Sequence, residues 1–438
     1  METPRTITGK ELMRPKTLPQ SFLFLALLSL GLACRSSGDG ADEGGSADAG
    51  GNVSSGRVEP GIQVLLSDSL HLVRGRRVGL ITNHTGIDAK GVASIDRLVE
   101  APEVELVALY SPEHGIRGTE RGGDQIESGS DPKTGLPIHS LYGATRKPTP
   151  EMLEGIEVLL FDIQDVGARY YTYVSTMALA MEAAGEAEVP FVVLDRPNPI
   201  GGLAVQGTIL DPDFSTFVGL FPGPMRHGMT PGELARMMVG EFGVEVALTI
   251  VPAAGWQRGM LFPETNLPWV PPSPNMPSVE SALHYPGTCL FEGTNLSVGR
   301  GTDSAFQLVG APWLDASALV SALEEYALPG VRFEEARFTP RGAGDGKFDG
   351  EEVIGVRLVS LGADYDPTWA ALAILRVAHD MSGDRWEWRV GHFDRLAGTD
   401  QLRLGIQEGR SVEDLRRGWD EALASFLDLR TQYLIYPM

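Results

Sequence analysis

The sequence predicts an α/β protein in which a mostly parallel sheet, covered by helices, is followed by a smaller second α/β domain. Short apolar runs alternate with helical stretches from residue 58 onward, as in successive βαβ units. The runs look buried on both faces, as parallel strands are when helices cover both sides of the sheet. At 438 residues and 42% hydrophobic content, the chain is globular and too long for one ordinary core.

Five strands and three helices are expected in the first domain, residues 58–302. The strands cover residues 77–82, 106–110, 157–161, 191–194 and 247–251, and the helices begin near residue 92 or cover about 174–187 and 230–242. The Pro-rich span 263–286 has neither periodicity and predicts an ordered binding loop. In the second domain, residues 303–438, strands are expected at 331–338 and 353–360 and helices at 366–380 and 412–429.

The N-terminus predicts export. Basic residues precede the apolar run 22–33, which is too short to span a bilayer stably and is typical of a signal peptide. The run ends at Gly31-Leu32-Ala33-Cys34, which resembles a bacterial lipoprotein cleavage site with Cys34 as the lipidated residue. Residues 35–57 are almost wholly Gly, Ser, Asp, Glu and Ala, and predict a disordered tether.

We therefore expect a signal peptide at residues 1–34 and a catalytic unit held on the bacterial envelope, at the periplasmic face or the cell surface. The alternative is an ordinary signal peptide that ends near a cysteine. Cys289 is the only other cysteine, so Cys34 has no obvious disulfide to form.

The charge balance excludes several partners. The chain has 58 acidic and 36 basic side chains, a net charge of −22, and its average field repels nucleic acid and anionic lipid headgroups. The membrane is therefore expected to be reached only through the lipid anchor. A substrate with a single carboxylate would have to be recruited by a few local arginines.

Polar side chains follow four of the five expected strands. These segments are Asn83-His84-Thr85-Gly86, Ser111-Pro112-Glu113-His114-Gly115-Ile116-Arg117-Gly118, Asp162-Ile163-Gln164-Asp165-Val166-Gly167-Ala168-Arg169 and Asp195-Arg196-Pro197-Asn198-Pro199. Ligands of open parallel sheets bind outside the carboxyl ends of the strands. An ordinary parallel sheet needs none of these side chains for stability, so they predict a shared active site along one rim.

Several standard chemistries lack their motifs. The first strand is not followed by G-x-G-x-x-G, and the chain has no G-x-S-x-G elbow, H-E-x-x-H or Cys/His cluster. The segment 345–350 looks briefly like a calcium loop, but Lys347 occupies a ligand position and Val356 stands where the bidentate glutamate belongs. That segment is interpreted as an exposed turn, and neither a metal nor a cofactor is expected.

Carboxylate chemistry remains. Glycosidic cleavage needs one carboxyl group to protonate the leaving oxygen and a second group to activate water, act as nucleophile or orient a neighbouring acetamide. Glu113, between a strand end and a glycine and next to His114, is the best acid candidate. Asp162 and Asp165 are both candidates for the second group, and the sequence does not choose between them.

Six ordered motifs now support a family resemblance. They are residues 111–115, 161–167, 194–199, 227–230, 272–277 and 285–295, which read SPEHG, FDIQDVG, LDRPNP, HGMT, PSPNMP and YPGTCLFEGTN. From about residue 62 to the C-terminus, the chain resembles the exo-β-N-acetylmuramidases of glycoside hydrolase family 171, the NamZ type.

The resemblance implies a Rossmann-like domain, a smaller C-terminal domain and an active-site cleft between them. It also implies release of terminal β-1,4-linked N-acetylmuramic acid from the non-reducing ends of peptidoglycan fragments, in cell-wall turnover and recycling. Glu113 matches the family's proposed catalytic acid. One departure is that Val298 stands where many members carry glutamate.

The residues in these motifs also suggest substrate contacts. One of Arg117, Arg169, Arg196 and Arg300 is expected to pair with the lactyl carboxylate of muramic acid. Further expected contacts are Asn83, His84, Gln164, Tyr171, Asp195, Asn198, His227, Glu292 and Asn295.

Two rival functions stay open at this point. A non-catalytic lipoprotein that captures muropeptides would keep the arginines and aromatic residues but would not need the glutamate at the strand end. A deacetylase or esterase acting on wall sugars would need a metal or serine constellation that the sequence does not show. The oligomeric state is not determined by the sequence.

Overall fold

The computed structural model describes residues 57–118 and 127–437. The expected signal peptide with Cys34 and, apart from residue 57, the expected tether lie outside the described residues. Within these two ranges, no helix combines the length and apolar character that a membrane span requires.

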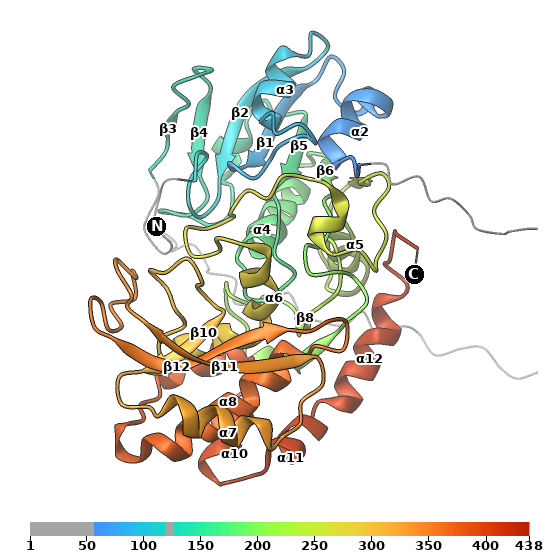
Figure 1. Cartoon of the computed structure of the whole chain (residues 1–438). Helices are drawn as coiled ribbons and strands as arrows, with labels where there is room; N and C mark the ends of the chain where they lie inside the picture. The colour runs from blue at the N-terminus through green and yellow to red at the C-terminus, as the bar shows by residue number, and fades with distance from the viewer. Residues whose placement is uncertain (1–56, 119–126, 438) are drawn as a thin grey trace, which may run out of the picture.

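A seven-stranded sheet forms the N-terminal part of the molecule (Figure 1). Its strands, in spatial order, are β3 (Gly129–Ser130), β4 (Pro137–Ser140), β2 (Glu105–Ser111), β1 (Arg77–Thr82), β5 (Val158–Asp162), β6 (Phe191–Leu194) and β9 (Leu248–Val251). Only the edge pair β3 and β4 is antiparallel. Numbered along the chain, the six parallel strands lie in the order 3-2-1-4-5-6 of the Rossmann fold. The Rossmann-like domain is confirmed, and the five expected strands are present to within one residue at each end.

Helices cover both faces of this sheet. They are α2 (Gly61–Asp68), α3 (Ser94–Glu100), α4 (Tyr173–Glu186) and α5 (Pro231–Glu241). Leu80 of β1 shares a buried cluster with residues of α2 and α3, whereas its neighbour Ile81 shares a second cluster with residues of α4 and α5. Successive side chains of a strand point to opposite faces, so strands covered on both sides need apolar residues at every position. The strands therefore appear in the sequence as runs of consecutive apolar residues.

The C-terminal part contains a three-stranded antiparallel sheet with helices. The strands lie in the order β10 (Leu308–Ala311), β12 (Val353–Ser360) and β11 (Val331–Phe338), and the main helices are α7 (Ala316–Glu324), α8 (Pro367–Ser382), α9 (Val390–Ala397) and α10 (Gln401–Gln407). The buried cluster that contains Ile81 continues through α8. The two parts of the molecule therefore share one apolar core.

Helices α2, α7, α9 and α10 were not expected from the sequence, and two other stretches fold differently from expectation. α6 (Val279–Thr288) begins within the span expected to be a loop, because the Ser278 side chain accepts a hydrogen bond from the Ser281 N–H and so caps its first turn. The helix expected over 412–429 is divided into α11 (Val412–Arg417) and α12 (Asp420–Arg430), with Gly418 between them. α6 packs against α8, although it precedes the expected domain boundary after residue 302.

The end of the chain returns to the first domain. α12 runs back toward α5, and the C-terminus lies beside that helix (Figure 1). Arg430 donates hydrogen bonds to the carbonyls of Gly202 and Gly228, and the hydroxyl of Tyr436 donates one to Asp195 at 2.7 Å. The last residues of the chain thus tie the two parts of the molecule together.

Candidate active site

A cavity of about 610 Å³ is lined by residues that follow β2 and β4, by the start of α4 and by residues of the C-terminal part. One wall carries Glu113, Tyr142 and Thr172 from the first domain. Residues later in the chain form a second group, called here the C-terminal wall: Glu292, Arg300, Arg341, Arg389 and His392. The expected cleft between the domains is therefore present, and its two walls differ in charge.

Glu113 lies in a tight turn directly after β2. Pro112 precedes it, and His114 and Gly115 both adopt positive φ angles, +70° and +74°. A positive φ is strained for a histidine, which is consistent with a turn shaped for function. The Glu113 side chain is half-buried and lines the cavity, and His114 beside it is buried.

Two hydroxyl groups hydrogen-bond to the Glu113 carboxyl. The Thr172 hydroxyl donates a hydrogen bond to Oε2 at 2.6 Å, and Tyr142 also hydrogen-bonds to this carboxyl. Burial raises the pKa of Tyr142 to about 12, with the Glu113 charge adding to the effect, so the phenol keeps its proton at neutral pH. Because hydroxyl groups can both donate and accept, this setting serves Glu113 in either protonation state.

The sequence offered both Asp162 and Asp165 as the second catalytic group, and the structure gives them different surroundings. Asp162 is fully buried and paired with Arg196, whose Nε lies 2.5 Å from Oδ1 and whose Nη2 lies 3.0 Å from Oδ2. Ser94 donates a further hydrogen bond to Asp162. Contrary to the expectation of a shared rim, Asp162 does not line the cavity, because both of its oxygens hold β5 to neighbouring loops.

Asp165 lies in the turn after β5 and is 4% exposed. Its Oδ1 accepts a hydrogen bond from the Gly167 N–H at 2.7 Å, and its Oδ2 has no hydrogen-bond partner among the described residues. Burial raises the pKa of this carboxyl to about 7, only partly offset by the backbone N–H groups of Gly167 and Val166. Asp165 does not itself line the cavity.

Glu292 is the second glutamate at the cavity, and it is held by a cation. Arg300 Nε donates to its Oε1 at 2.5 Å, Arg300 Nη2 pairs with the same oxygen, and the Cys289 thiol lies 3.5 Å from Oε2. Burial alone would raise the pKa of the Glu292 carboxyl, but Arg300 outweighs it and the pKa lies below its ordinary value. Glu292 is therefore ionised at neutral pH, with both oxygens engaged.

Three of the four arginines expected to read a lactyl carboxylate lie away from the cavity. Arg117 pairs with Asp131, and Arg196 with Asp162. Arg169 donates to the backbone carbonyls of Thr208, Gly223 and Leu396. Only Arg300 lines the cavity, and its charge is already paired.

Several other expected contacts hold loops together instead of lining the cavity. These residues are Asn83, His84, Gln164, Asp195, Asn198 and Asn295. Asn83 and Asn198, for example, use their amide groups on neighbouring backbone. Polar residues at strand ends therefore divide between substrate-facing positions and loop supports. Of the residues expected at the site, Glu113, His114, Tyr171, Glu292 and Arg300 line the cavity.

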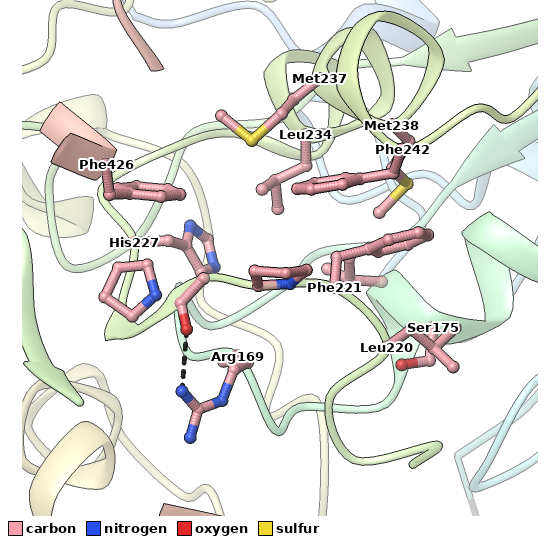
Figure 2. Close-up of a pocket in the computed structure, with 14 residues that line it drawn as sticks. Arg169, Ser175, Leu220, Phe221, His227, Leu234, Met237, Met238, Phe242 and Phe426 are labelled. Carbon is pink, nitrogen blue, oxygen red and sulfur yellow. Dashed lines mark hydrogen bonds between the residues drawn. The ribbon is translucent and has the colours of Figure 1, made fainter. Parts of the chain in front are cut away.

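His227 lies in a different, smaller cavity of about 50 Å³ (Figure 2). Its Nδ1 accepts a hydrogen bond from the Met229 N–H, and burial lowers the pKa of the imidazole to about 3. Apolar residues, among them Met237, Phe242 and Phe426, line this cavity. His227 is not among the residues that line the main cavity.

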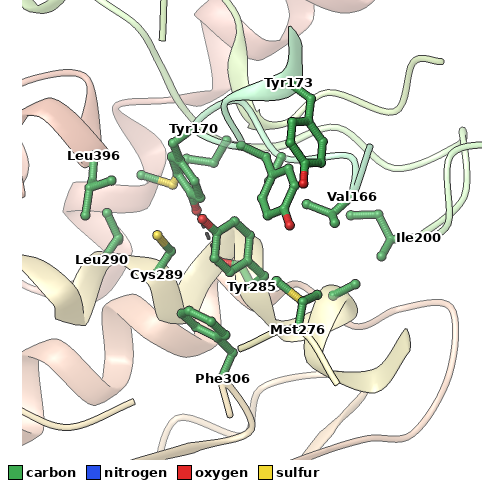
Figure 3. Packing of buried hydrophobic residues seen from close by; sticks show 14 of the residues in the cluster. Val166, Tyr170, Tyr173, Ile200, Met276, Tyr285, Cys289, Leu290, Phe306 and Leu396 are labelled. Atoms are coloured by element: carbon green, nitrogen blue, oxygen red, sulfur yellow. Dashed lines mark hydrogen bonds between the residues drawn. The ribbon is translucent and has the colours of Figure 1, made fainter. Parts of the chain in front are cut away.

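Aromatic side chains pack beneath the main cavity (Figure 3). Tyr285 contacts Tyr170 and Phe306 edge to face, with ring centroids 5.4 and 4.7 Å apart. Tyr171 and Tyr173 pack at 5.1 Å in the same way, and the Tyr173 hydroxyl donates to the Pro272 carbonyl at 2.6 Å. These rings form a rigid floor and bury most of their surface in the core.

Sequence reasoning missed several cavity residues. They are Tyr142, Thr172, Arg341, Arg389 and His392. Asp345, the first residue of the segment interpreted as an exposed turn, lines the cavity together with Arg341, and both belong to the loop that connects β11 to β12. No group of metal-ligating side chains occurs among residues 57–118 and 127–437. Val298, the departure from the family pattern, is fully buried and outside the cavity lining.

Family models match both parts of the chain. The N-terminal model of the exo-beta-N-acetylmuramidase NamZ matches residues 78–280, and the C-terminal model matches residues 283–436. The peptidoglycan beta-N-acetylmuramidase NamZ of Bacillus subtilis is 47% identical over 382 residues, which cover 87% of this chain and 92% of that protein.

Solved structures show the same architecture. Two crystal structures of DUF1343 family proteins from Bacteroides fragilis each cover 87% of this chain and 99% of their own. The first is 38% identical with a TM-score of 0.82, and the second is 31% identical with a TM-score of 0.69.

Proposed function

The chain belongs to the exo-β-N-acetylmuramidase NamZ family, and we propose from this membership that it removes N-acetylmuramic acid from the non-reducing ends of peptidoglycan fragments. The observation that carries this proposal is Glu113, a half-buried carboxyl in a cavity large enough for sugar residues, held by hydroxyl groups. The enzyme is a glycosidase that acts in cell-wall turnover.

Glu113 is the general acid of this reaction. In the cleavage step its carboxyl proton passes to the glycosidic oxygen, and the bond from that oxygen to the anomeric carbon breaks. Water later adds its oxygen to the same carbon and gives up a proton, which restores the Glu113 carboxyl. Thr172 and Tyr142 hold the carboxyl at the cavity wall. Asp162 is unsuited to a role in this step because Arg196 and Ser94 occupy its oxygens.

A disaccharide assay tests the function. Purified protein without residues 1–57 should release free N-acetylmuramic acid from MurNAc-GlcNAc. The isomer GlcNAc-MurNAc, which has the muramic acid at the reducing end, should stay intact and serves as the matched control. Release of no sugar, or equal cleavage of both disaccharides, would contradict an exo-muramidase that acts at non-reducing ends.

We further propose that the enzyme is exported and anchored to the envelope through lipidated Cys34. The apolar run, the Leu-Ala-Cys end and the Gly/Ser-rich stretch that follows support this proposal. Wild-type protein should partition into detergent and incorporate a fatty-acid analogue, whereas Cys34→Ala should do neither. Equal labelling of the two proteins would refute the lipid anchor.

A further inference from the structure

Two cavity arginines are not committed to any carboxylate. Arg341 and Arg389 are exposed and line the cavity, and neither forms an ion pair with a carboxylate of the described residues. Arg300, in contrast, lines the same wall with its guanidinium on Glu292. Among the described residues, Arg341 and Arg389 are therefore the arginines that line this cavity without a carboxylate partner.

Their backbones are held firmly while their side chains remain accessible. The Arg341 N–H donates to the Gly301 carbonyl at 3.1 Å, and a β-carbon at Gly301 would lie 2.6 Å from the Arg341 carbonyl oxygen, so these two loops are in close contact. The Arg389 N–H donates to the Gly293 carbonyl at 2.8 Å. Fixed anchor points reduce the entropy lost when the side chains bind a ligand.

The other charged groups around this wall do not cancel the two arginines. Asp303 and Asp345 also line the cavity, but neither lies within ion-pair distance of Arg341 or Arg389 in the described structure. Asp345 instead accepts a hydrogen bond from the Lys347 N–H at 3.1 Å. His392 lies among them, and burial lowers its pKa, so the imidazole is neutral at pH 7 and is a hydrogen-bonding group.

The expected substrate has one anionic group that such cations could bind. Muramic acid differs from glucosamine by a lactyl carboxylate, and the net charge of −22 opposes its approach to the protein. Guanidinium groups bind carboxylates with paired, charge-assisted hydrogen bonds.

We propose that Arg341 and Arg389, on the C-terminal wall, form the subsite that binds the free lactyl carboxylate of the terminal muramic acid. This inference rests on the proposed function and assigns selectivity to the C-terminal wall. A muramic acid whose lactyl group is amidated, as when a peptide is attached, lacks the charge that the subsite recognises. The enzyme therefore selects muramic acid over glucosamine, and free over amidated lactyl groups.

A comparison of two enzymes on three substrate analogues tests the subsite. Wild type and the Arg341→Gln/Arg389→Gln variant are compared on the nitrophenyl glycosides of N-acetylmuramic acid, of its lactyl amide and of N-acetylglucosamine. Two charge-assisted interactions are lost in the variant, so kcat/KM on the muramic acid glycoside should fall by roughly 10²-fold, mostly through KM. On the amide and the glucosaminide, the two proteins should differ by less than about threefold.

Arg332→Gln is the matched control, because Arg332 is an exposed arginine on β11 that pairs with Glu334 and does not line the cavity. It should keep wild-type kinetics, and thermal melting should show all variants folded. If the double variant keeps full selectivity for muramic acid, the subsite is refuted while the hydrolase stands. If the double variant instead loses as much activity on the lactyl amide as on the free acid, the arginines do not recognise the lactyl charge and the lactyl assignment is wrong. A wild-type enzyme that cleaves none of the glycosides points to failure of the proposed function itself.

Discussion

The cavity contains two glutamates that differ in the neighbours the described residues give them. Glu113, after β2, is held by the hydroxyl groups of Thr172 and Tyr142. Glu292, on the other wall, is bound by the guanidinium of Arg300, which only donates hydrogen bonds and keeps the carboxyl ionised. The same side chain is thus suited to proton transfer in one place and to orienting a cation in the other, because neighbours set its chemistry.

The largest effect that separates these roles is on turnover of the natural disaccharide. Glu113→Gln should lower kcat by roughly 10²- to 10⁴-fold, because the amide has no transferable proton. Glu292→Gln should lower it by less than about tenfold, since the amide still accepts from Arg300. Steady-state kinetics on MurNAc-GlcNAc measures both. A larger loss for Glu292→Gln would reverse the assignment.

A buried carboxyl near Glu113 gives the next effect, on stability. The pKa of Asp165 in the folded protein, about 7, exceeds its ordinary value of 3.8. Its contribution to stability is therefore complete below about pH 4 and is lost as the pH rises to about 7. Asp165→Asn should remove this pH-dependent loss of stability, which is on the order of 2–4 kcal/mol between about pH 4 and pH 7. Urea unfolding of both proteins at pH 4 and pH 8 measures it, and parallel pH profiles would contradict the raised pKa.

Removing the cation from Glu292 should also cost stability. Arg300→Met leaves a largely buried carboxylate without its partner and should lower the free energy of unfolding by about 2–3 kcal/mol. Arg300→Met/Glu292→Gln should recover more than half of that loss, because no charge is then left unpaired. Denaturant unfolding at pH 7 provides the values. Equal stability of the single and double variants would show that the ion pair is not coupled.

Some strands and site residues could be predicted from the sequence, for physical reasons that particular residues show. Runs of consecutive apolar residues predicted β1, β2, β5, β6 and β9, because a strand buried on both faces needs apolar side chains on both. β4, Pro137–Ser140, was missed because this short strand, next to the edge strand β3, has only one aliphatic residue that is not proline. Glu113 was found because it directly follows a strand.

The residues that sequence reasoning misplaced or missed depend on long-range contacts. Asp162 ends β5 and Asp165 follows it, and the two are distinguished by Arg196 and Ser94, which bind Asp162 from 34 and 68 positions away. Arg341 and Arg389 reach the cavity through contacts with Gly301 and Gly293, which no local pattern reveals. Strand-end motifs therefore predict one wall of the cavity much better than the other.

The smallest effect concerns the hydroxyl neighbours of Glu113. Tyr142→Phe removes one hydrogen bond to the carboxyl but keeps the ring, which packs against Phe217. A single hydrogen bond of this kind contributes about 1 kcal/mol, so kcat should fall about fivefold. Phe217→Leu, which perturbs only the packing, is the control. An unchanged kcat in Tyr142→Phe would show that Tyr142 does not support the acid.

The most direct test of Glu113 as the general acid compares leaving groups. A nitrophenolate departs with little protonation, whereas a sugar alkoxide does not. In single-turnover experiments on bond cleavage, Glu113→Gln should therefore lose roughly 10²-fold or more on MurNAc-GlcNAc and less than about tenfold on nitrophenyl N-acetylmuramide. Equal losses on the two substrates, or near-normal turnover of the disaccharide, would contradict the assignment of Glu113 as the acid.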